Sequence, residues 1–130
     1  MARPPSATIQ HIMLRKTPFV NGEFYHIFNQ GVDKRNIFQD EFDYQRFLQS
    51  IEEFNTIEPI GSIYEHQIVK KKFGGPTSKM GELVNIICYC LNSNHYHFLL
   101  EQIYDNGIPI FMHKIGTGYS RYFNEKNQRR

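Results

Sequence analysis

The chain has 130 residues, of which 40% are hydrophobic and 15% aromatic; this is enough for one globular domain with a core and excludes a disordered tail. The formal net charge of +2 does not by itself indicate a nucleic-acid-binding protein. No apolar run approaches the ~20 residues of a membrane span and the N-terminus has no apolar signal region, so we expect a cytoplasmic protein without a membrane partner.

The N-terminal region divides into an arm and a strand. Residues 1–20 carry three prolines and no regular spacing of apolar residues, so we expect a loosely ordered arm before a domain over 21–130. Residues 22–31 (GEFYHIFNQG) are rich in aromatic and β-branched residues and end at a glycine. This composition predicts a strand, with a loop after it.

A helix is predicted between Asp40 and Pro59. Asp40 is a typical N-cap residue, and Pro59 stops the helix. The apolar residues between them recur at helical spacing, and we expect them to be buried: Tyr44, Phe47, Leu48, Ile51 and Phe54. The polar residues of this segment should face water: Asp43, Gln45, Arg46, Gln49 and Glu52.

The next segments have strand character. Residues 60–69 favour a strand, and residues 70–81 (KKKFGGPTSKMG) favour a loop. Residues 82–91 (ELVNIICYCL) are apolar enough for a strand buried on both faces. After a tight turn, residues 95–103 (HYHFLLEQI) are predicted to run back antiparallel to that strand.

A second helix follows a turn at residues 105–107. Pro109 suits its first helical position, and the apolar residues of the segment repeat at helical spacing: Phe111, Ile115, Tyr119 and Tyr122. Gly116 and Gly118 weaken a helix unless another group approaches it closely. The order of elements predicts a ferredoxin-like α+β fold, with an antiparallel sheet, helices on one face and the other face open for a site.

Two cysteines, Cys88 and Cys90, stand at i and i+2 in a predicted strand. This spacing is too short for an ordinary disulfide and is not a CxxC pair. We expect buried free thiols, which suits a reducing compartment.

His95 and His97 are also separated by one residue. Residues i and i+2 of a strand point to the same face, so the two imidazoles could hold one metal ion. On spacing alone, partly buried histidines bonded to backbone or water are the favoured explanation, because a metal needs a third ligand and supporting groups.

Three segments in register resemble the HUH single-tyrosine transposases, in particular the IS200-like and REP-associated types. Residues 88–102 (CYCLNSNHYHFLLEQ) resemble the His–hydrophobe–His motif and the strand and turn before it. Residues 24–38 (FYHIFNQGVDKRNIF) resemble the first strand and its loop, and residues 116–127 (GTGYSRYFNEKN) resemble the second helix.

The resemblance implies metal-assisted cleavage and rejoining of single-stranded or hairpin DNA. In such a reaction Mg²⁺ or Mn²⁺ neutralises charge at the scissile phosphate while a tyrosine forms a phosphotyrosine link. His95 and His97 match the metal-binding pair. Magnesium prefers oxygen ligands, so a site of two histidines would hold it weakly, and later first-row metals would bind more tightly.

The chain departs from this family after its second helix. The family has a fourth strand and a third helix there, which carry the nucleophilic tyrosine and a further metal ligand. We therefore expect a C-terminally truncated member whose catalytic residue is unknown. Tyr119 is the substitute candidate, although its place in an apolar helical repeat predicts a core residue.

Several further residues are candidates for DNA contact. His26 could contact a phosphate or be a structural histidine, and the other candidates are polar or basic residues of loops and of the second helix: Asn29, Lys34, Arg35, Lys70, Lys71, Lys72 and Arg121. Solvated loops explain the same residues without DNA.

Three functions therefore stay open: a transposase-like enzyme domain, a non-catalytic DNA-binding module derived from one, and a small metal-binding protein without a DNA role. An unpaired sheet edge also makes a homodimer possible.

Overall fold

A computed structural model describes residues 17–57 and 81–128. The predicted strand at 60–69, the loop at 70–81 except Gly81, and nearly all of the predicted N-terminal arm lie outside these ranges. The described elements are β1 (Phe24–Gln30), the short 3-10 helix η1 (Val32–Lys34), α2 (Glu41–Glu53), β2 (Val84–Asn92), β3 (His95–Gln102) and α4 (Gly107–Lys126).

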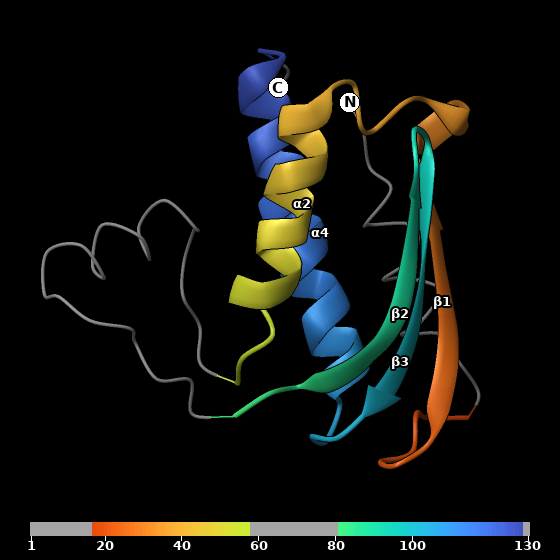
Figure 1. Cartoon of the computed structure of the whole chain (residues 1–130). Helices are drawn as coiled ribbons and strands as arrows, with labels where there is room; N and C mark the ends of the chain where they lie inside the picture. Colours follow the sequence, from red (N-terminus) through yellow and green to blue (C-terminus); the bar gives the residue numbers. More distant parts are fainter. Residues whose placement is uncertain (1–16, 58–80, 129–130) are drawn as a thin grey trace, which may run out of the picture.

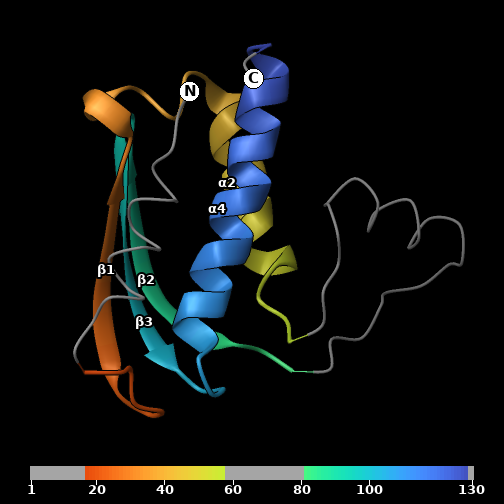
Figure 2. The ribbon, with the colours of Figure 1, turned by 180° about the vertical axis from the view of Figure 1, so that it is seen from behind.

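The three described strands form an antiparallel sheet in the order β1-β3-β2. Helices α2 and α4 lie side by side over one face, and no described element covers the other face (Figures 1 and 2). This arrangement confirms the α+β class with an antiparallel sheet and helices on one face, and it is compatible with a ferredoxin-like fold.

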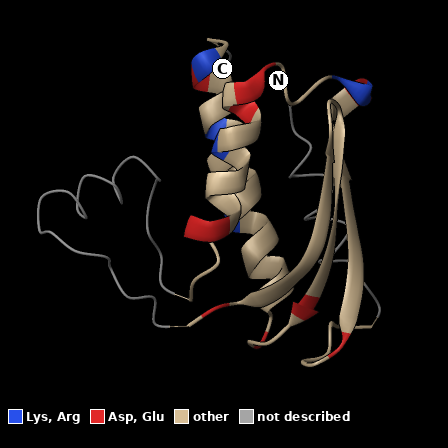
Figure 3. Cartoon of the chain, viewed as in Figure 1, with Lys and Arg blue, Asp and Glu red and all other residues tan. Residues whose placement is uncertain are grey.

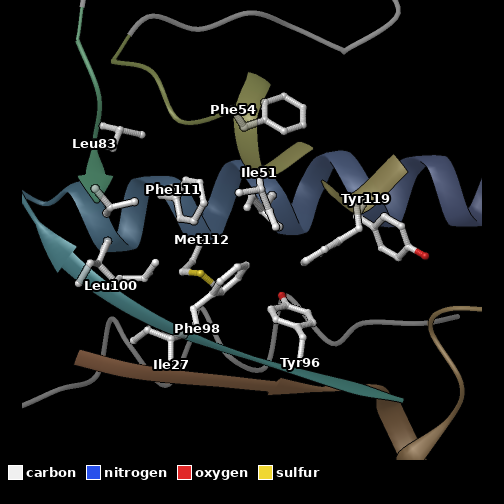
Figure 4. Close-up of a cluster of buried hydrophobic side chains, with 14 of the residues drawn as sticks. Ile27, Ile51, Phe54, Leu83, Tyr96, Phe98, Leu100, Phe111, Met112 and Tyr119 are labelled. Carbon is white, nitrogen blue, oxygen red and sulfur yellow. The ribbon is translucent and has the colours of Figure 1, made fainter. Parts of the chain in front are cut away.

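Alternation along β3 separates the core from the open face. Tyr96, Phe98 and Leu100 are buried, and His95, His97 and Leu99, which alternate with them along the strand, are partly exposed. The buried side chains point towards the helices and meet Phe111 and Tyr119 of α4 there (Figure 4). One side of β3 therefore builds the core, and its other side leaves two histidines at the surface.

Helix α2 begins where its cap predicts, because the Asp40 carboxylate accepts a hydrogen bond from the Asp43 amide at 3.1 Å. Two side-chain predictions for this helix are wrong. Asp43 is completely buried rather than solvated, and Leu48 is 37% exposed rather than buried. Helix α4 packs against the side of α2 that carries Asp43, so this residue joins Phe47, Ile51 and Phe54 in the buried surface and Leu48 is left outside it.

Helix α4 begins at Gly107, so Pro109 is its third residue and not its first. The Ile108 amide donates to the Gln102 side chain at 3.1 Å, which satisfies one free amide of the first turn. At Gly118 another side chain does approach the helix closely, as a glycine inside a helix suggests. A Cβ atom at this position would stand 2.6 Å from the ring of Phe54.

Strand β2 is mostly exposed, which corrects the prediction of a strand buried on both faces. A bulge between Ile86 and Cys88 shifts its register on β3. Beyond the bulge, Cys88 and Cys90 pair with Leu99 and His97 on the open face, and both thiols are exposed rather than buried.

The residues just before β1 are attached to the sheet. The Phe19 ring packs edge-on against Tyr25 with centroids 4.6 Å apart, and the Val20 amide donates to the Tyr25 hydroxyl at 2.8 Å. These contacts join Phe19 and Val20 to the domain, although the sequence placed them in the loosely ordered arm.

Candidate functional site

Three histidines meet on the open face of the sheet. His95 and His97 share this face, as the strand period predicts, and His26 joins them from β1. The His26 Nε2 and His97 Nδ1 atoms are 2.8 Å apart, and their rings stack at a centroid distance of 5.0 Å. Phe28 packs beside them, 5.0 Å from the His97 ring. We call His26, Phe28, His95 and His97 the open-face cluster.

Two asparagines hold the His95 ring: Asn92, the last residue of β2, and Asn94 of the β2–β3 turn. Its Nδ1 lies 2.7 Å from the Asn94 side-chain oxygen, and its Nε2 lies 3.1 Å from the Asn92 side-chain nitrogen. An amide oxygen only accepts and an amide nitrogen only donates, so Nδ1 carries the proton and the Nε2 lone pair accepts the hydrogen bond from Asn92. A metal at Nε2 would take the place of this Asn92 donor. Metal-binding histidines are commonly oriented in this way, by a hydrogen bond from the nitrogen that does not bind the metal.

The His97 imidazole favours its neutral form. Burial lowers its pKa from the ordinary value of 6.5, and the neighbouring His26 and His95 lower it further because like charges repel. A neutral ring keeps a lone pair for a metal at neutral pH.

The donors on this face suit some metals better than others. His95 and His97 have ring centroids 5.1 Å apart, a separation compatible with one ion about 2.1 Å from a nitrogen of each ring. Within residues 17–57 and 81–128, no group of three His, Cys, Asp or Glu side chains is arranged to hold a metal. The imidazole donors fit later first-row metals such as Ni²⁺, Cu²⁺ and Zn²⁺ better than Mg²⁺ or Mn²⁺.

Tyr119 lies in the core on the other side of the sheet (Figure 4). Its side chain is 3% exposed and packs against Phe38 and Phe47, and its hydroxyl donates to the Ile37 carbonyl oxygen. Burial raises the pKa of this hydroxyl, and the Asp43 carboxylate raises it further. The prediction of a core residue is confirmed, and no hydroxyl at this place can reach the open-face cluster.

Among the predicted DNA contacts, Asn29 needs correction. It alternates onto the covered face, is 1% exposed and donates to the Tyr96 hydroxyl at 2.9 Å. Its side chain belongs to the core and therefore cannot contact DNA on the open face. The alternation that exposes His26 and Phe28 also explains this burial.

The basic candidates fall in different places. Lys34 is exposed and Arg35 half-buried beside η1, at the end of the sheet where β3 begins; the Asn94 side chain donates to the Lys34 carbonyl oxygen at 3.3 Å. Arg121 is exposed on α4, in the helical layer, so the structure does not bring it to the open-face cluster. Lys70, Lys71 and Lys72 lie outside the described residues.

The sequence reading missed Phe28, Asn92 and Asn94. Phe28 stands two residues after His26 in a predicted strand, so alternation alone could have placed it on the same face. The asparagines became recognisable only when the turn brought them to the His95 ring.

The chain has no significant match among protein-family models, curated proteins or solved structures. In the part of the chain that the structure describes, no helix has the length and apolar character needed to cross a membrane.

Proposed function

We propose that this protein is a transposase-like DNA-binding domain whose open sheet face binds single-stranded or hairpin DNA. The observation that carries the proposal is the meeting of His26, His95 and His97 on a face that no described element covers. The sequence resemblance supplies the class of DNA and the reaction. Lys34 and Arg35 lie at one end of this face and add positive charge for phosphates.

His95 and His97 would hold a divalent metal, Mn²⁺ or Mg²⁺, against a phosphate of the bound strand. The bound metal would polarise the scissile phosphate and neutralise its charge. The protein's part is orientation: Asn94 holds the His95 ring, and His26 contacts the His97 ring. Metal-assisted strand cleavage and rejoining is the activity that we propose for the complete site.

A non-catalytic DNA-binding module is the second candidate, and one observation favours it. The described strands contain three tyrosines, and strand alternation places all of them on the face that the helices cover: Tyr25, Tyr89 and Tyr96. Tyr119 is enclosed in the core. None of these four tyrosines therefore presents its hydroxyl beside the histidines to attack a phosphate.

A homodimer is a further part of the proposal. Strands β1 and β2 are the two edges of the described sheet. An edge strand offers unpaired backbone groups that a second copy can bind. Sedimentation analysis over a range of protein concentrations tests for this association.

DNA binding should depend on Lys34 and Arg35 and on salt. We expect the protein to bind a single strand or hairpin more tightly than a plain duplex, with affinity falling steeply as salt rises. Replacing Lys34 and Arg35 by glutamate should remove up to two phosphate contacts. Each lost contact should reduce the slope of log K against log salt by about 0.7 for a single strand. Fluorescence anisotropy with labelled oligonucleotides at several salt concentrations measures both effects.

Arg121→Glu is the matched control, because it reverses one exposed positive charge on the helical layer. An equal loss of affinity in Arg121→Glu would place the DNA on the helices instead of the open face. Absence of binding to every form of DNA at low salt would reject both the enzyme and the binding module.

Metal binding should require the histidine pair. We expect calorimetric titration with Mn²⁺ or Ni²⁺ to give heat that saturates at about one ion per chain, with tighter binding of Ni²⁺. His95→Ala or His97→Ala should abolish this heat. His113→Ala, an exposed histidine on α4, should leave it unchanged. Equal heats from His95→Ala and the unmodified protein would remove the proposed site.

A further inference from the structure

Phe28 is a large aromatic side chain that the fold leaves at the surface. It is 43% exposed, while its chain neighbours Ile27 and Asn29 are buried on the other face. The ring is held by imidazoles: its centroid lies 5.0 Å from that of His97 and 5.7 Å from that of His95, with the planes tilted by 47° and 45°. The core does not account for this position, since the ring lies on the opposite side of the sheet.

The electrostatic surroundings of Phe28 suit a polyanion. Across the sheet, Phe28 pairs with His97, which pairs with Cys90 on its other side; none of these side chains is acidic. The end of the sheet nearest His95 carries two basic residues, Lys34 and Arg35, and one acidic residue, Asp33. The one acidic residue of the described strands, Glu101, lies at the opposite end of the sheet, where Glu23, Glu82 and Asp105 flank the strands (Figure 3).

Phe24, the other exposed aromatic residue on this face of β1, lies in the acidic part. It is 57% exposed, and its partner across the sheet is Glu101. A carboxylate at this position disfavours a nearby phosphate, so the two phenyl rings are not equivalent. Of these two phenylalanines, only Phe28 combines an exposed ring with imidazole neighbours and nearby basic residues.

We propose that Phe28 stacks against one unpaired base of the bound nucleic acid. This inference rests on the proposed function and names the contact that selects single strands. An exposed ring can stack only on a base whose face is free, and a plain duplex hides its base faces inside the stack. With a base on Phe28, the sugar-phosphate backbone on either side lies within the region of His95, His97 and Lys34. The ring therefore recognises an unpaired base, and the nitrogen groups around it bind the backbone.

The first test compares alanine substitutions at two exposed phenylalanines. Stacking on one aromatic side chain accounts for about a 5- to 150-fold difference in affinity. We therefore expect Phe28→Ala to weaken binding to a short mixed-sequence single strand by this factor, with little change for a duplex of the same sequence. Phe42→Ala, at a 74% exposed site on α2, should change neither affinity. Phe24→Ala should have a smaller effect than Phe28→Ala.

The second test uses the absence of tryptophan from the chain. Phe28→Trp places a single indole in the open-face cluster, and stacking of a base on it should quench its fluorescence when the same oligonucleotide is added. Phe42→Trp gives the control, whose emission should not change. Quenching confined to Phe28→Trp supports the inference.

The outcomes separate this inference from the function on which it rests. If the unmodified protein binds single-stranded DNA while Phe28→Ala keeps full affinity and Phe28→Trp is not quenched, the stacking role is overturned and the DNA-binding function stands. If the unmodified protein binds no form of DNA, the proposed function falls and the stacking role falls with it. Circular dichroism of Phe28→Ala should match that of the unmodified protein, because the ring lies outside the core.

Discussion

Replacement of Asp43 by alanine should lower the free energy of unfolding by about 2–4 kcal/mol. The Asp43 carboxylate is completely buried where α2 meets α4. One of its oxygens accepts hydrogen bonds from the Tyr122 hydroxyl and the Lys126 ammonium, each at 2.7 Å, and the other accepts from the Gln39 amide at 2.8 Å. Alanine would leave these donors without their shared acceptor.

Urea denaturation followed by circular dichroism measures this loss. Glu41→Ala is the matched control, because Glu41 is an exposed acid in the first turn of the same helix. Asp43→Asn keeps the shape of the side chain without its charge and should fall between the two. A loss in Asp43→Ala no larger than that in Glu41→Ala would show that the buried carboxylate does not hold the helices together.

Tyr119→Ala should destabilise the protein by about 3–5 kcal/mol, the usual cost of removing a large buried aromatic ring. The ring contacts Phe38, Phe47, Tyr122 and Phe123, so its loss opens a cavity between the helices and the sheet. Tyr119→Phe keeps the ring and loses only the hydrogen bond to the Ile37 carbonyl oxygen. Its cost should be about 1–3 kcal/mol. The same urea titrations measure both values.

Tyr119→Phe also tests whether Tyr119 is a nucleophile. We expect the chain not to cleave hairpin DNA efficiently with Mn²⁺, because the Tyr119 hydroxyl is buried on the side of the sheet opposite the histidines. A covalent protein–DNA band on a denaturing gel is the readout. A strong band from the unmodified protein that disappears in Tyr119→Phe would make Tyr119 the nucleophile and contradict this geometry.

Local sequence patterns were sufficient where one element decides the outcome. The Asp40 cap, the helical spacing of Phe47, Ile51 and Phe54, and the shared face of His95 and His97 all depend on residues a few positions apart. The backbone geometry of a helix or strand sets these relations before any tertiary contact forms. The α+β class with helices on one face followed from the order of such elements.

Contacts between distant segments decided the rest. Asp43 is buried because Tyr122 and Lys126, some eighty positions later, supply its partners. His26 reaches His97 through the register of β1 on β3, and a bulge in β2 turns Cys90 towards the same face. Strand register and helix packing are chosen by the total fit of the core, which no single segment encodes. The sequence alone therefore determined the histidine pair, and only the tertiary structure assembled the open-face cluster around it and enclosed Tyr119 on the opposite side.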